Sequence, residues 1–247
     1  MSKLLQGKRC IVTGGSRGLG REIVLAFARE GADVAFTYSK RTADAEETLR
    51  LLGEEGLSAK VFQGSVADAR HVSATVASLV GEWGSIDVLV NNAGLNQVVP
   101  MALLEEAEWD EVLDVNLKGP YLFSRAVLRH MIRRKTGTIL QIGAFSSERI
   151  VDSPVHFAAA KSGLRGFTEA LGREVGRHGI RVNLLAPGLL DVGLGRMLLP
   201  HRIAEYEEQA ALGRTGTAVE VARFAVFMVS DEGSFMTGAK ISLDGGL

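Results

Sequence analysis

A glycine-rich turn is the first feature of the sequence that could do chemistry. Residues Thr13–Gly20 read TGGSRGLG, directly after the apolar run Cys10–Thr13 and before a segment with helical periodicity. Glycines permit a tight turn and a close approach of the backbone to a phosphate, and the N-terminus of the next helix supplies free N–H groups. The position of the turn therefore predicts a pocket for the pyrophosphate of a dinucleotide. The alternative is a turn that only connects a strand to a helix.

Charges at the end of the predicted second strand bear on which dinucleotide would bind. A carboxylate there accepts a hydrogen bond from a ribose 2′-hydroxyl and repels a 2′-phosphate, whereas a basic residue accommodates the phosphate. This chain has Ser39, Lys40 and Arg41 at that point and no acidic residue, and Arg17 in the turn adds a further cation. The sequence thus favours NADP(H) over NAD(H). The alternative is that Lys40 and Arg41 are solvated loop charges.

Alternating strands and helices must position these groups. Short β-rich apolar runs predict seven strands, at Cys10–Thr13, Val34–Tyr38, Lys60–Gln63, Val88–Val90, Thr138–Ile142, Arg181–Leu185 and Lys240–Leu243. Apolar residues at three- and four-residue spacing predict helices between them, at Arg21–Glu30, Ala43–Glu55, Ala69–Trp83 and Val155–Arg177. This alternation is typical of a parallel sheet with crossover helices. We expect one α/β domain over residues 1–247, a Rossmann-type doubly wound parallel sheet of about seven strands.

One segment departs from this regular pattern. Residues 188–211 are rich in Leu, Gly and Met and contain Pro200. Long irregular connections of this kind are often functional, so we expect a mobile lid over a site. The alternative is an ordinary packed helical excursion.

Further motifs follow in a fixed order along the chain. Residues 91–94 read NNAG after the fourth strand, residues 115–119 read VNLKG, Pro187-Gly188 follows the sixth strand, and residues 244–246 read DGG. Together with the Gly-x-x-x-Gly-x-Gly spacing of the turn, they resemble the short-chain dehydrogenase/reductase family, and most closely its bacterial 3-oxoacyl-[acyl-carrier-protein] reductases. The resemblance covers essentially the whole chain and implies that family's Rossmann-type fold.

The resemblance also implies a cofactor site. In the family the NNAG segment steadies the central sheet and borders the adenosine ribose, and the residue matching Lys161 holds the nicotinamide ribose. The implied cofactor-binding residues are Gly14, Ser16, Arg17, Gly18, Leu19, Gly20, Ser39, Lys40, Arg41, Asn91, Ala93, Gly94, Lys161, Pro187 and Gly188. Two positions depart from the family pattern: Ser65 replaces an Asp beside the adenine, and Val192 replaces a Thr that touches the nicotinamide carboxamide.

The catalytic positions of the family fall on residues without hydroxyl groups. The family uses an Asn, a Ser after the fifth strand, a Tyr on the next helix and a Lys four residues later. The Tyr protonates the carbonyl oxygen, the Ser holds that oxygen, and the Lys lowers the pKa of the phenol. Asn116 and Lys161 are retained here, but Phe157 occupies the Tyr position and Ala144, thirteen residues earlier, the Ser position. Loss of the general acid typically slows such a reaction about 10²–10⁴-fold. Loss of the oxyanion donor typically slows it a further factor of about 10²–10³.

Several polar residues nearby are candidates to replace the missing Ser and Tyr hydroxyl groups. Ser146 and Ser147 would need a rebuilt loop. His156 is adjacent to Phe157, but consecutive helical residues point about 100° apart, which favours a structural role. Other polar residues, on the loop after the fifth strand and in the expected lid, are Glu148, Arg149, Asp152, His201, Arg202, Glu205 and Tyr206.

Three functional hypotheses therefore remain open. The first is a divergent NADP(H)-dependent oxidoreductase in which water, Lys161 or a loop residue delivers the proton. The second is a non-redox enzyme on the same scaffold, such as a dehydratase, isomerase or cyclase, because fold does not fix function. The third is a catalytically silent, cofactor-binding subunit. A deliberate substitution of Ala144 and Phe157 is a further alternative, against which the departures at Ser65 and Val192 argue.

Composition limits the partners of the protein. The chain has 28 Lys+Arg and 29 Asp+Glu, a formal charge of −1, which gives no reason to expect nucleic acid. The first residues lack an apolar leader, and no stretch approaches the ~18 apolar residues of a membrane span, so we expect a cytoplasmic protein without membrane contact. Cys10 is the only cysteine, which excludes an internal disulfide and a Cys-rich zinc site, and we expect no metal.

The resemblance implies the remaining partners. It points to a small-molecule or acyl-thioester substrate and to a homotetramer, or a heteromer with an active homologue. Acyl carrier protein is acidic and would need a basic patch. A candidate for it is the group Arg125, Arg129, Arg133, Arg134 and Lys135. A solvated helix face is the alternative.

Overall fold

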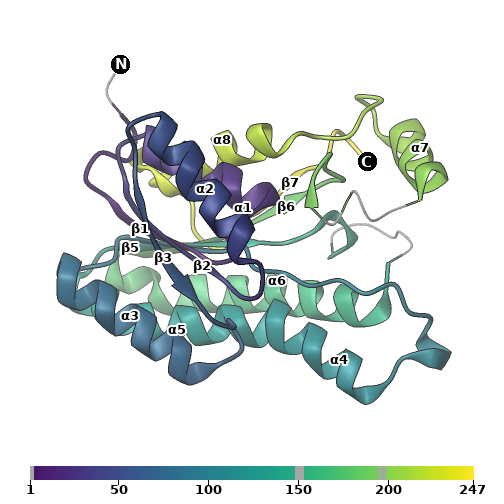
Figure 1. Cartoon of the computed structure of the whole chain (residues 1–247). Coiled ribbons are helices and arrows are strands. Elements are labelled where there is room, and N and C mark those ends of the chain that lie inside the picture. Colours follow the sequence, from purple (N-terminus) through teal and green to yellow (C-terminus); the bar gives the residue numbers. More distant parts are fainter. Residues whose placement is uncertain (1–2, 148–152, 194, 196–198) are drawn as a thin grey trace.

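The strands form one parallel sheet (Figure 1). The computed structural model describes residues 3–147, 153–193, 195 and 199–247. Among these residues the strands are β1 Arg9–Val12, β2 Asp33–Tyr38, β3 Ala59–Gln63, β4 Val88–Asn91, β5 Gly137–Ile142, β6 Ile180–Pro187 and β7 Lys240–Leu243. They lie in the order β3-β2-β1-β4-β5-β6-β7, and every neighbouring pair is parallel. The predicted single-domain, doubly wound fold is confirmed.

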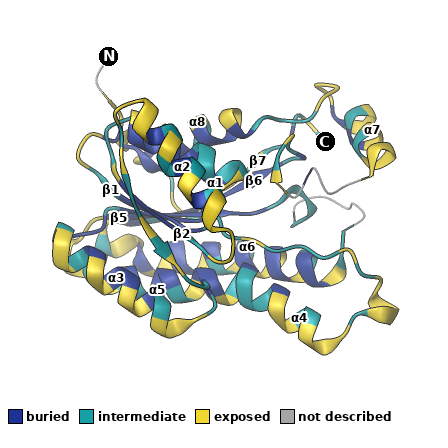
Figure 2. Ribbon diagram, in the orientation of Figure 1, coloured by how far each residue is buried: buried dark blue, intermediate teal, exposed yellow. Residues whose placement is uncertain are grey.

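Helices cover both faces of the sheet, as Figure 1 shows. Their bounds are α1 Gly18–Arg29, α2 Thr42–Glu54, α3 Ala69–Trp83, α4 Glu106–Leu113, α5 Gly119–Arg134, α6 Val155–Val175, α7 Pro200–Gln209 and α8 Ala218–Val229. Side chains of α1, α2 and α8 pack into one core, and those of α3, α5 and α6 into the other. Figure 2 shows that the helix faces turned toward the sheet are buried and the opposite faces exposed.

Alternation of side chains along the strands explains the two cores. In β1, Cys10 and Val12 join the core with α1, whereas Ile11 joins the core with α5. Successive side chains of a strand point to opposite faces, so a strand covered on both sides is apolar throughout. This is why the strands appear in the sequence as short continuous apolar runs.

The segment expected to be a lid contains a packed helix. Leu189 and two residues of α7, Tyr206 and Ala210, form a small buried cluster, against which Phe145 and Leu247 pack. Residues 194 and 196–198 lie outside the described part of the chain. The helical alternative therefore fits α7, and movement of the segment as a lid stays a prediction.

The described residues form neither a membrane-spanning helix nor a metal cluster. None of the helices there combines the length and the hydropathy that crossing a bilayer requires. No cluster of three His, Cys, Asp or Glu side chains there is arranged to hold a metal ion.

Candidate functional site

The glycine-rich turn lies where the strand order changes direction. In the sheet β1 lies between β2 and β4. The strands β2 and β3 follow on one side of β1, and β4 to β7 follow on the other, so the strand order changes direction at β1. The crevice therefore lies at the carboxyl end of β1. Open α/β sheets bind ligands in the crevice at such a switch point. The turn from β1 to α1 therefore occupies the position expected of a dinucleotide site.

Glycines are required in this turn by close packing and by backbone conformation. Gly14 and Gly18 have φ angles of +66° and +54°, in the left-handed region that favours glycine. A Cβ on Gly14 would lie 2.9 Å from Cα of Ala93, and one on Gly20 would lie 2.1 Å from the carbonyl oxygen of Gly14. Any side chain would push the turn open. The turn is thus a cradle in which no side chain at Gly14, Gly18 or Gly20 covers the backbone, as the predicted pyrophosphate site requires.

Asn92 fixes this cradle from the β4 side. Its Nδ2 donates to the carbonyl oxygens of Thr13 and Gly14 at 2.9 and 3.1 Å. The Thr13 hydroxyl oxygen accepts hydrogen bonds from the backbone N–H groups of Asn92 and Ala93, both at 3.0 Å. Asn92 is absent from the predicted site residues. The NNAG motif that contains it was the available signal, but its bracing role depends on a contact across the sheet.

A second clamp holds the other side of the cradle. The Ser16 carbonyl oxygen accepts hydrogen bonds from Nη2 of Arg21 at 2.8 Å and from the Thr48 hydroxyl at 2.9 Å. Arg17 stands at the N-cap of α1, and no side chain of the described residues caps that helix start. Because the first N–H groups of a helix have no intrahelical partner, they stay available to a phosphate. These residues fit the dinucleotide expected from the sequence.

The residues after β2 carry exposed positive charge. The Lys40 side chain is 84% exposed, and its Nζ lies 4.0 Å from Oε1 of Glu111. Nη1 of Arg41 lies 3.9 Å from Oδ2 of Asp44, also at the surface. The backbone of Ser39 accepts a hydrogen bond from Gln63. Neither ion pair is short or buried, so both cations are available to a ligand phosphate.

Asn91, a predicted cofactor neighbour, is turned away from this crevice. Its Nδ2 donates to the Ser124 hydroxyl at 3.2 Å and lies 3.5 Å from the Pro120 carbonyl oxygen, both on α5. The side chain is buried. The Asn91 side chain therefore ties β4 to α5, and its role as a cofactor neighbour stays a prediction.

Asn116 is placed by a local widening of the helix. Residues 114–118 form a π-helical turn between α4 and α5. Nδ2 of Asn116 donates to the carbonyl oxygens of Leu95 at 2.7 Å and Val112 at 2.9 Å, and its Oδ1 accepts from the Leu95 N–H at 3.3 Å. A single π-turn inside a helix often marks a functional site. Here it ties the helix to the segment that follows NNAG.

Asn116 and Lys161 converge on Gly94. A Cβ added to Gly94 would lie 3.1 Å from Oδ1 of Asn116 and 3.9 Å from Nζ of Lys161. Three predicted site residues from the β4 loop, the π-turn and α6 are therefore brought together. They are far apart in the sequence, and only the sheet and α6 bring them to one point.

Lys161 is a buried cation beside Phe157. Its side chain is 5% exposed, and Nζ donates to the Ile142 carbonyl oxygen at 2.8 Å. Nζ lies 5.8 Å from the centre of the Phe157 ring. Burial lowers the pKa of Lys161 from 10.5 to about 8, because the charged form loses hydration. The ring contact shows that Phe157 and Lys161 share one helix face, as their spacing predicts.

The next feature is the segment of Ala144, Ser146 and Ser147, which could supply a replacement hydroxyl group. The Ala144 carbonyl oxygen accepts hydrogen bonds from the Ser147 N–H at 3.0 Å and from the Ser147 hydroxyl at 2.7 Å. The Ser146 hydroxyl is buried and has no hydrogen-bond partner among the described residues. The Ser147 hydroxyl thus closes the turn after β5. Ala144, at the position where the resemblance implies a Ser, presents only a methyl group.

The other candidate replacements lie elsewhere or are occupied. The Tyr206 hydroxyl donates to the Asp244 carbonyl oxygen at 2.6 Å, its ring packs edge-on against Phe145, and burial raises its pKa.

His156 is fully buried, and its ring nitrogens have no hydrogen-bond partner among the described residues. Burial lowers the pKa of His156, which Glu108 partly opposes. Arg202 pairs with Glu205 at the surface, and His201 is exposed there. Glu148, Arg149 and Asp152 lie outside the described residues.

The segment after β6 closes against the cradle. The position of a Cβ on Gly18 would be 3.5 Å from Cα of Gly193 and 4.0 Å from Cγ2 of Val192. Gly188 has no room for a side chain, because its Cβ would lie 2.1 Å from the Tyr206 hydroxyl oxygen. Val192 and Gly193, which follow the Pro187-Gly188 motif, thus lie beside Gly18 of the glycine-rich turn. A valine at this position offers no hydrogen bond to a ligand amide.

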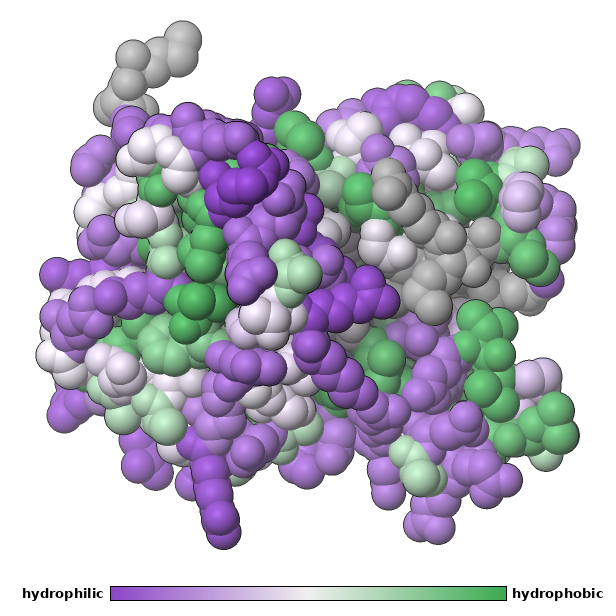
Figure 3. All heavy atoms as spheres, viewed as in Figure 1, coloured by the Kyte–Doolittle hydropathy of each residue, from purple (hydrophilic) through white to green (hydrophobic). Residues whose placement is uncertain are grey.

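Apolar side chains gather beyond the site. Val98, Met101 and Leu103, on the segment between β4 and α4, are exposed, as is Leu199 just before α7. Figure 3 shows apolar surface in green at the end of the molecule where Figure 1 places α4 and α7.

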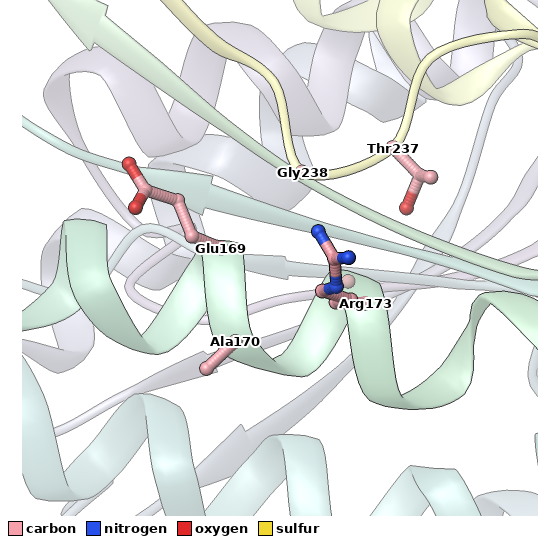
Figure 4. Close-up of a pocket in the computed structure, with 6 residues that line it drawn as sticks. Glu169, Ala170, Arg173, Thr237 and Gly238 are labelled. Carbon is pink, nitrogen blue, oxygen red and sulfur yellow. The ribbon is translucent and has the colours of Figure 1, made fainter.

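A surface hollow lies at a different place. Glu169, Ala170 and Arg173 of α6 line it together with Thr237 and Gly238, which precede β7 (Figure 4). Glu169 pairs with Lys240 at 3.0 Å. The hollow is two helical turns or more beyond Lys161 along α6, so it is separate from the site described above.

Comparisons with known proteins identify the family of the chain. A family model described as Enoyl-(Acyl carrier protein) reductase matches residues 14–247. The 3-oxoacyl-[acyl-carrier-protein] reductase FabG of Chlamydia muridarum is 38% identical over 247 residues, covering 100% of both chains. The FabG of Escherichia coli K12 is 34% identical over 242 residues, covering 98% of both chains.

Solved structures show the same fold. A gluconate 5-dehydrogenase from Burkholderia cenocepacia in complex with NADP and tartrate has a TM-score of 0.93 and 31% identity, covering 100% of this chain and 97% of that one. A short-chain dehydrogenase/reductase from Serratia marcescens has a TM-score of 0.91 and 32% identity, covering 98% of both chains. The chain therefore belongs to the short-chain dehydrogenase/reductase family of oxidoreductases and resembles its 3-oxoacyl-[acyl-carrier-protein] reductases.

Proposed function

We propose that the protein is an NADP(H)-binding oxidoreductase of carbonyl compounds with an altered proton-donor site. The observation that carries this proposal is the convergence of Asn116 and Lys161 on Gly94, with Phe157 and Ala144 where the family has its hydroxyl groups. The cofactor half of the site is complete, whereas the acid half has lost both donors. Such a site binds its cofactor and turns over slowly.

The chain's own residues would hold the cofactor in two parts. The cradle of Gly14, Gly18 and Gly20 would take the pyrophosphate, and Lys40 with Arg17 would take a ribose 2′-phosphate. The complex of the Burkholderia relative with NADP supports this preference. When bound, the cofactor supplies or accepts a hydride. The protein's part is to orient the cofactor and to move the matching proton.

Lys161 is the group that we propose for the proton step. In the direction of reduction, the carbonyl carbon receives the hydride, its C=O electron pair moves to oxygen, and the oxygen needs one proton. A general acid works best when its pKa lies near the operating pH, and burial has brought the pKa of Lys161 to about 8. Lys161 would give its proton through a water molecule, because Phe157 has no hydroxyl to pass it on.

We infer an acyl-thioester substrate with an apolar chain. The exposed Val98, Met101 and Leu103 offer apolar contact on the segment that follows NNAG, and the FabG relatives are named for 3-oxoacyl carriers. Arg125, Arg129 and Arg133 are exposed at four-residue spacing on α5, which supports docking of an acidic carrier protein.

The test begins with the cofactor. Purified protein is titrated with NADPH and with NADH by calorimetry, and NADPH oxidation is then followed with a short 3-oxoacyl thioester. We expect tighter binding of NADPH, slow oxidation, and loss of that oxidation in Lys161→Met. Restoring the donors with Ala144→Ser and Phe157→Tyr should raise the rate about 10²-fold or more, the typical contribution of a general acid. Failure to bind either cofactor would overturn the proposal.

One observation favours a second function, that of a silent subunit. Phe235, which precedes β7, is fully exposed. Val219 and Phe227 of α8, earlier in the C-terminal part of the chain, are partly exposed. Large exposed apolar groups favour an assembly with further copies or with an active homologue. Light scattering of the purified protein checks this. NADPH binding without any carbonyl turnover, even at high protein concentration, would favour the silent subunit over the enzyme.

A further inference from the structure

An ion pair crosses the crevice in which the dinucleotide would lie. Lys40 follows β2, and Glu111 belongs to α4, which follows β4 in the chain. Both β2 and β4 pair with β1, one on each side of it. The 4.0 Å contact between Nζ of Lys40 and Oε1 of Glu111 therefore reaches over the carboxyl end of β1.

The two partners of this pair differ in how firmly they are held. The other carboxylate oxygen of Glu111 accepts a hydrogen bond from Nε2 of Gln97 at 3.1 Å, on the segment that follows NNAG. Glu111 is thereby fixed to the β4 side of the crevice. Lys40 has a long side chain that is 84% exposed, against 48% for Glu111. Lys40 is thus the partner that can leave.

We propose that Glu111 sets the discrimination between NADP(H) and NAD(H), by competing with the ribose 2′-phosphate for Lys40. The inference rests on the proposed function, because it assumes that a dinucleotide occupies the crevice. Glu111 is not among the residues from which the sequence predicts the NADP(H) preference. Its role follows from the contact with Lys40 across the crevice.

The two cofactors meet this pair differently. A 2′-phosphate carries close to two negative charges, so Lys40 exchanges one carboxylate for a more strongly charged partner. The same phosphate is repelled by Glu111, which stays in place through Gln97. NAD(H) lacks the phosphate, so it offers Lys40 no replacement. Glu111 therefore weakens NADP(H) binding through competition and repulsion, and affects NAD(H) little.

The test variant is Glu111→Gln, which keeps the shape of the side chain and an amide oxygen for Gln97. We expect the dissociation constant of NADPH to fall about three- to fivefold, as befits an exposed charge pair, and that of NADH to change less than about twofold. The control is Asp110→Asn, which removes the same charge from the adjacent exposed position of α4. Asp110 has no ion pair among the described residues, and its side chain points about 100° away from that of Glu111.

A double-mutant cycle isolates the contact itself. In a Lys40→Gln background, Glu111→Gln should lose most of its effect on NADPH, because the competition needs Lys40. The fragments 2′,5′-ADP and 5′-ADP should reproduce the difference between the two cofactors, since they differ in the 2′-phosphate. The effect should shrink between about 50 mM and about 500 mM salt, because salt screens exposed charges.

The outcomes separate the two proposals. If the wild-type protein binds NADPH, but Glu111→Gln changes its affinity no more than Asp110→Asn, the role of Glu111 is refuted and the proposed function stands. The same holds if the effect of Glu111→Gln persists undiminished without Lys40. If the wild-type protein binds neither cofactor nor 2′,5′-ADP, both proposals are overturned.

Discussion

Replacing Lys161 with methionine should stabilise the protein near neutral pH, although it removes a hydrogen bond. The fall in the pKa of Lys161 from 10.5 to about 8 corresponds to about 3 kcal/mol of unfavourable free energy for the charged form in the folded state. The lost hydrogen bond to Ile142 is worth about 1 kcal/mol, and the contact with the Phe157 ring about 0.5–1 kcal/mol. We expect Lys161→Met to raise the free energy of unfolding by about 1–2 kcal/mol at about pH 7.

The sign of the pH dependence follows from the direction of the shift. Between about pH 8 and pH 10.5 the unfolded chain keeps the Lys161 proton while the folded protein has released it, so raising the pH favours the folded state. The penalty on the wild-type protein is therefore fully present below about pH 8 and disappears through this window. The advantage of Lys161→Met should vanish, and reverse slightly, by about pH 10.5.

Urea unfolding at a series of pH values measures this effect. Taking the difference between variant and wild type cancels the titration of other groups. Lys118→Met is the control, since Lys118 is half-exposed and pairs with Asp114 at the surface, so its difference should stay small and flat with pH. A destabilised Lys161→Met protein at neutral pH, or a difference that does not change with pH, would refute the reasoning. The variant should also bind NADPH more weakly, the common conflict between stability and function at a site.

Three further substitutions test how the structure holds the site. Asn92→Ala removes both hydrogen bonds to the carbonyls of the glycine-rich turn, so it should lower the free energy of unfolding by about 1–3 kcal/mol and weaken NADPH binding in the same calorimetric titration. Gly20→Ala would place its methyl carbon 2.1 Å from the Gly14 carbonyl oxygen, and should destabilise the fold and abolish cofactor binding. Its control, Gly53→Ala in α2, meets nothing within 4 Å and should stabilise the protein by about 0.5–1 kcal/mol in urea unfolding. Tyr206→Phe loses the bond to the carbonyl before the C-terminal glycines, so the protein should lose about 1 kcal/mol; an unchanged midpoint would contradict the anchoring of α7.

The fold was predictable because its signals are local. Continuous apolar runs predict strands buried on both faces, and apolar residues at helical spacing predict the helices between them. Their alternation leaves few topologies, and the seven strands occur where the runs lie. The helix α8 was not predicted, because it is apolar on most of its surface and shows a weak polar face. The π-turn that carries Asn116 lies between α4 and α5, and no pattern in the sequence predicted it.

The candidate site was predictable only in part. The glycine-rich turn, the spacing of Phe157 and Lys161, and the absence of acid after the second strand are short patterns that depend on neighbours in the chain. They predict which residues form the site and which hydroxyl groups it lacks. They say nothing of how Lys161 is solvated, and its lowered pKa exists because the folded chain buries it.

Sequence by itself determined the doubly wound fold, and it predicts the phosphate-binding turn and the loss of both hydroxyl donors, because each depends on residue types at fixed short spacing. Tertiary structure alone decided what supports and limits the site. Asn92 bonds a turn nearly eighty residues away, Glu111 meets Lys40 across the crevice, and the Tyr206 hydroxyl is held by the C-terminal segment. Such contacts join residues that the sheet brings together from distant parts of the chain, and no local periodicity encodes them.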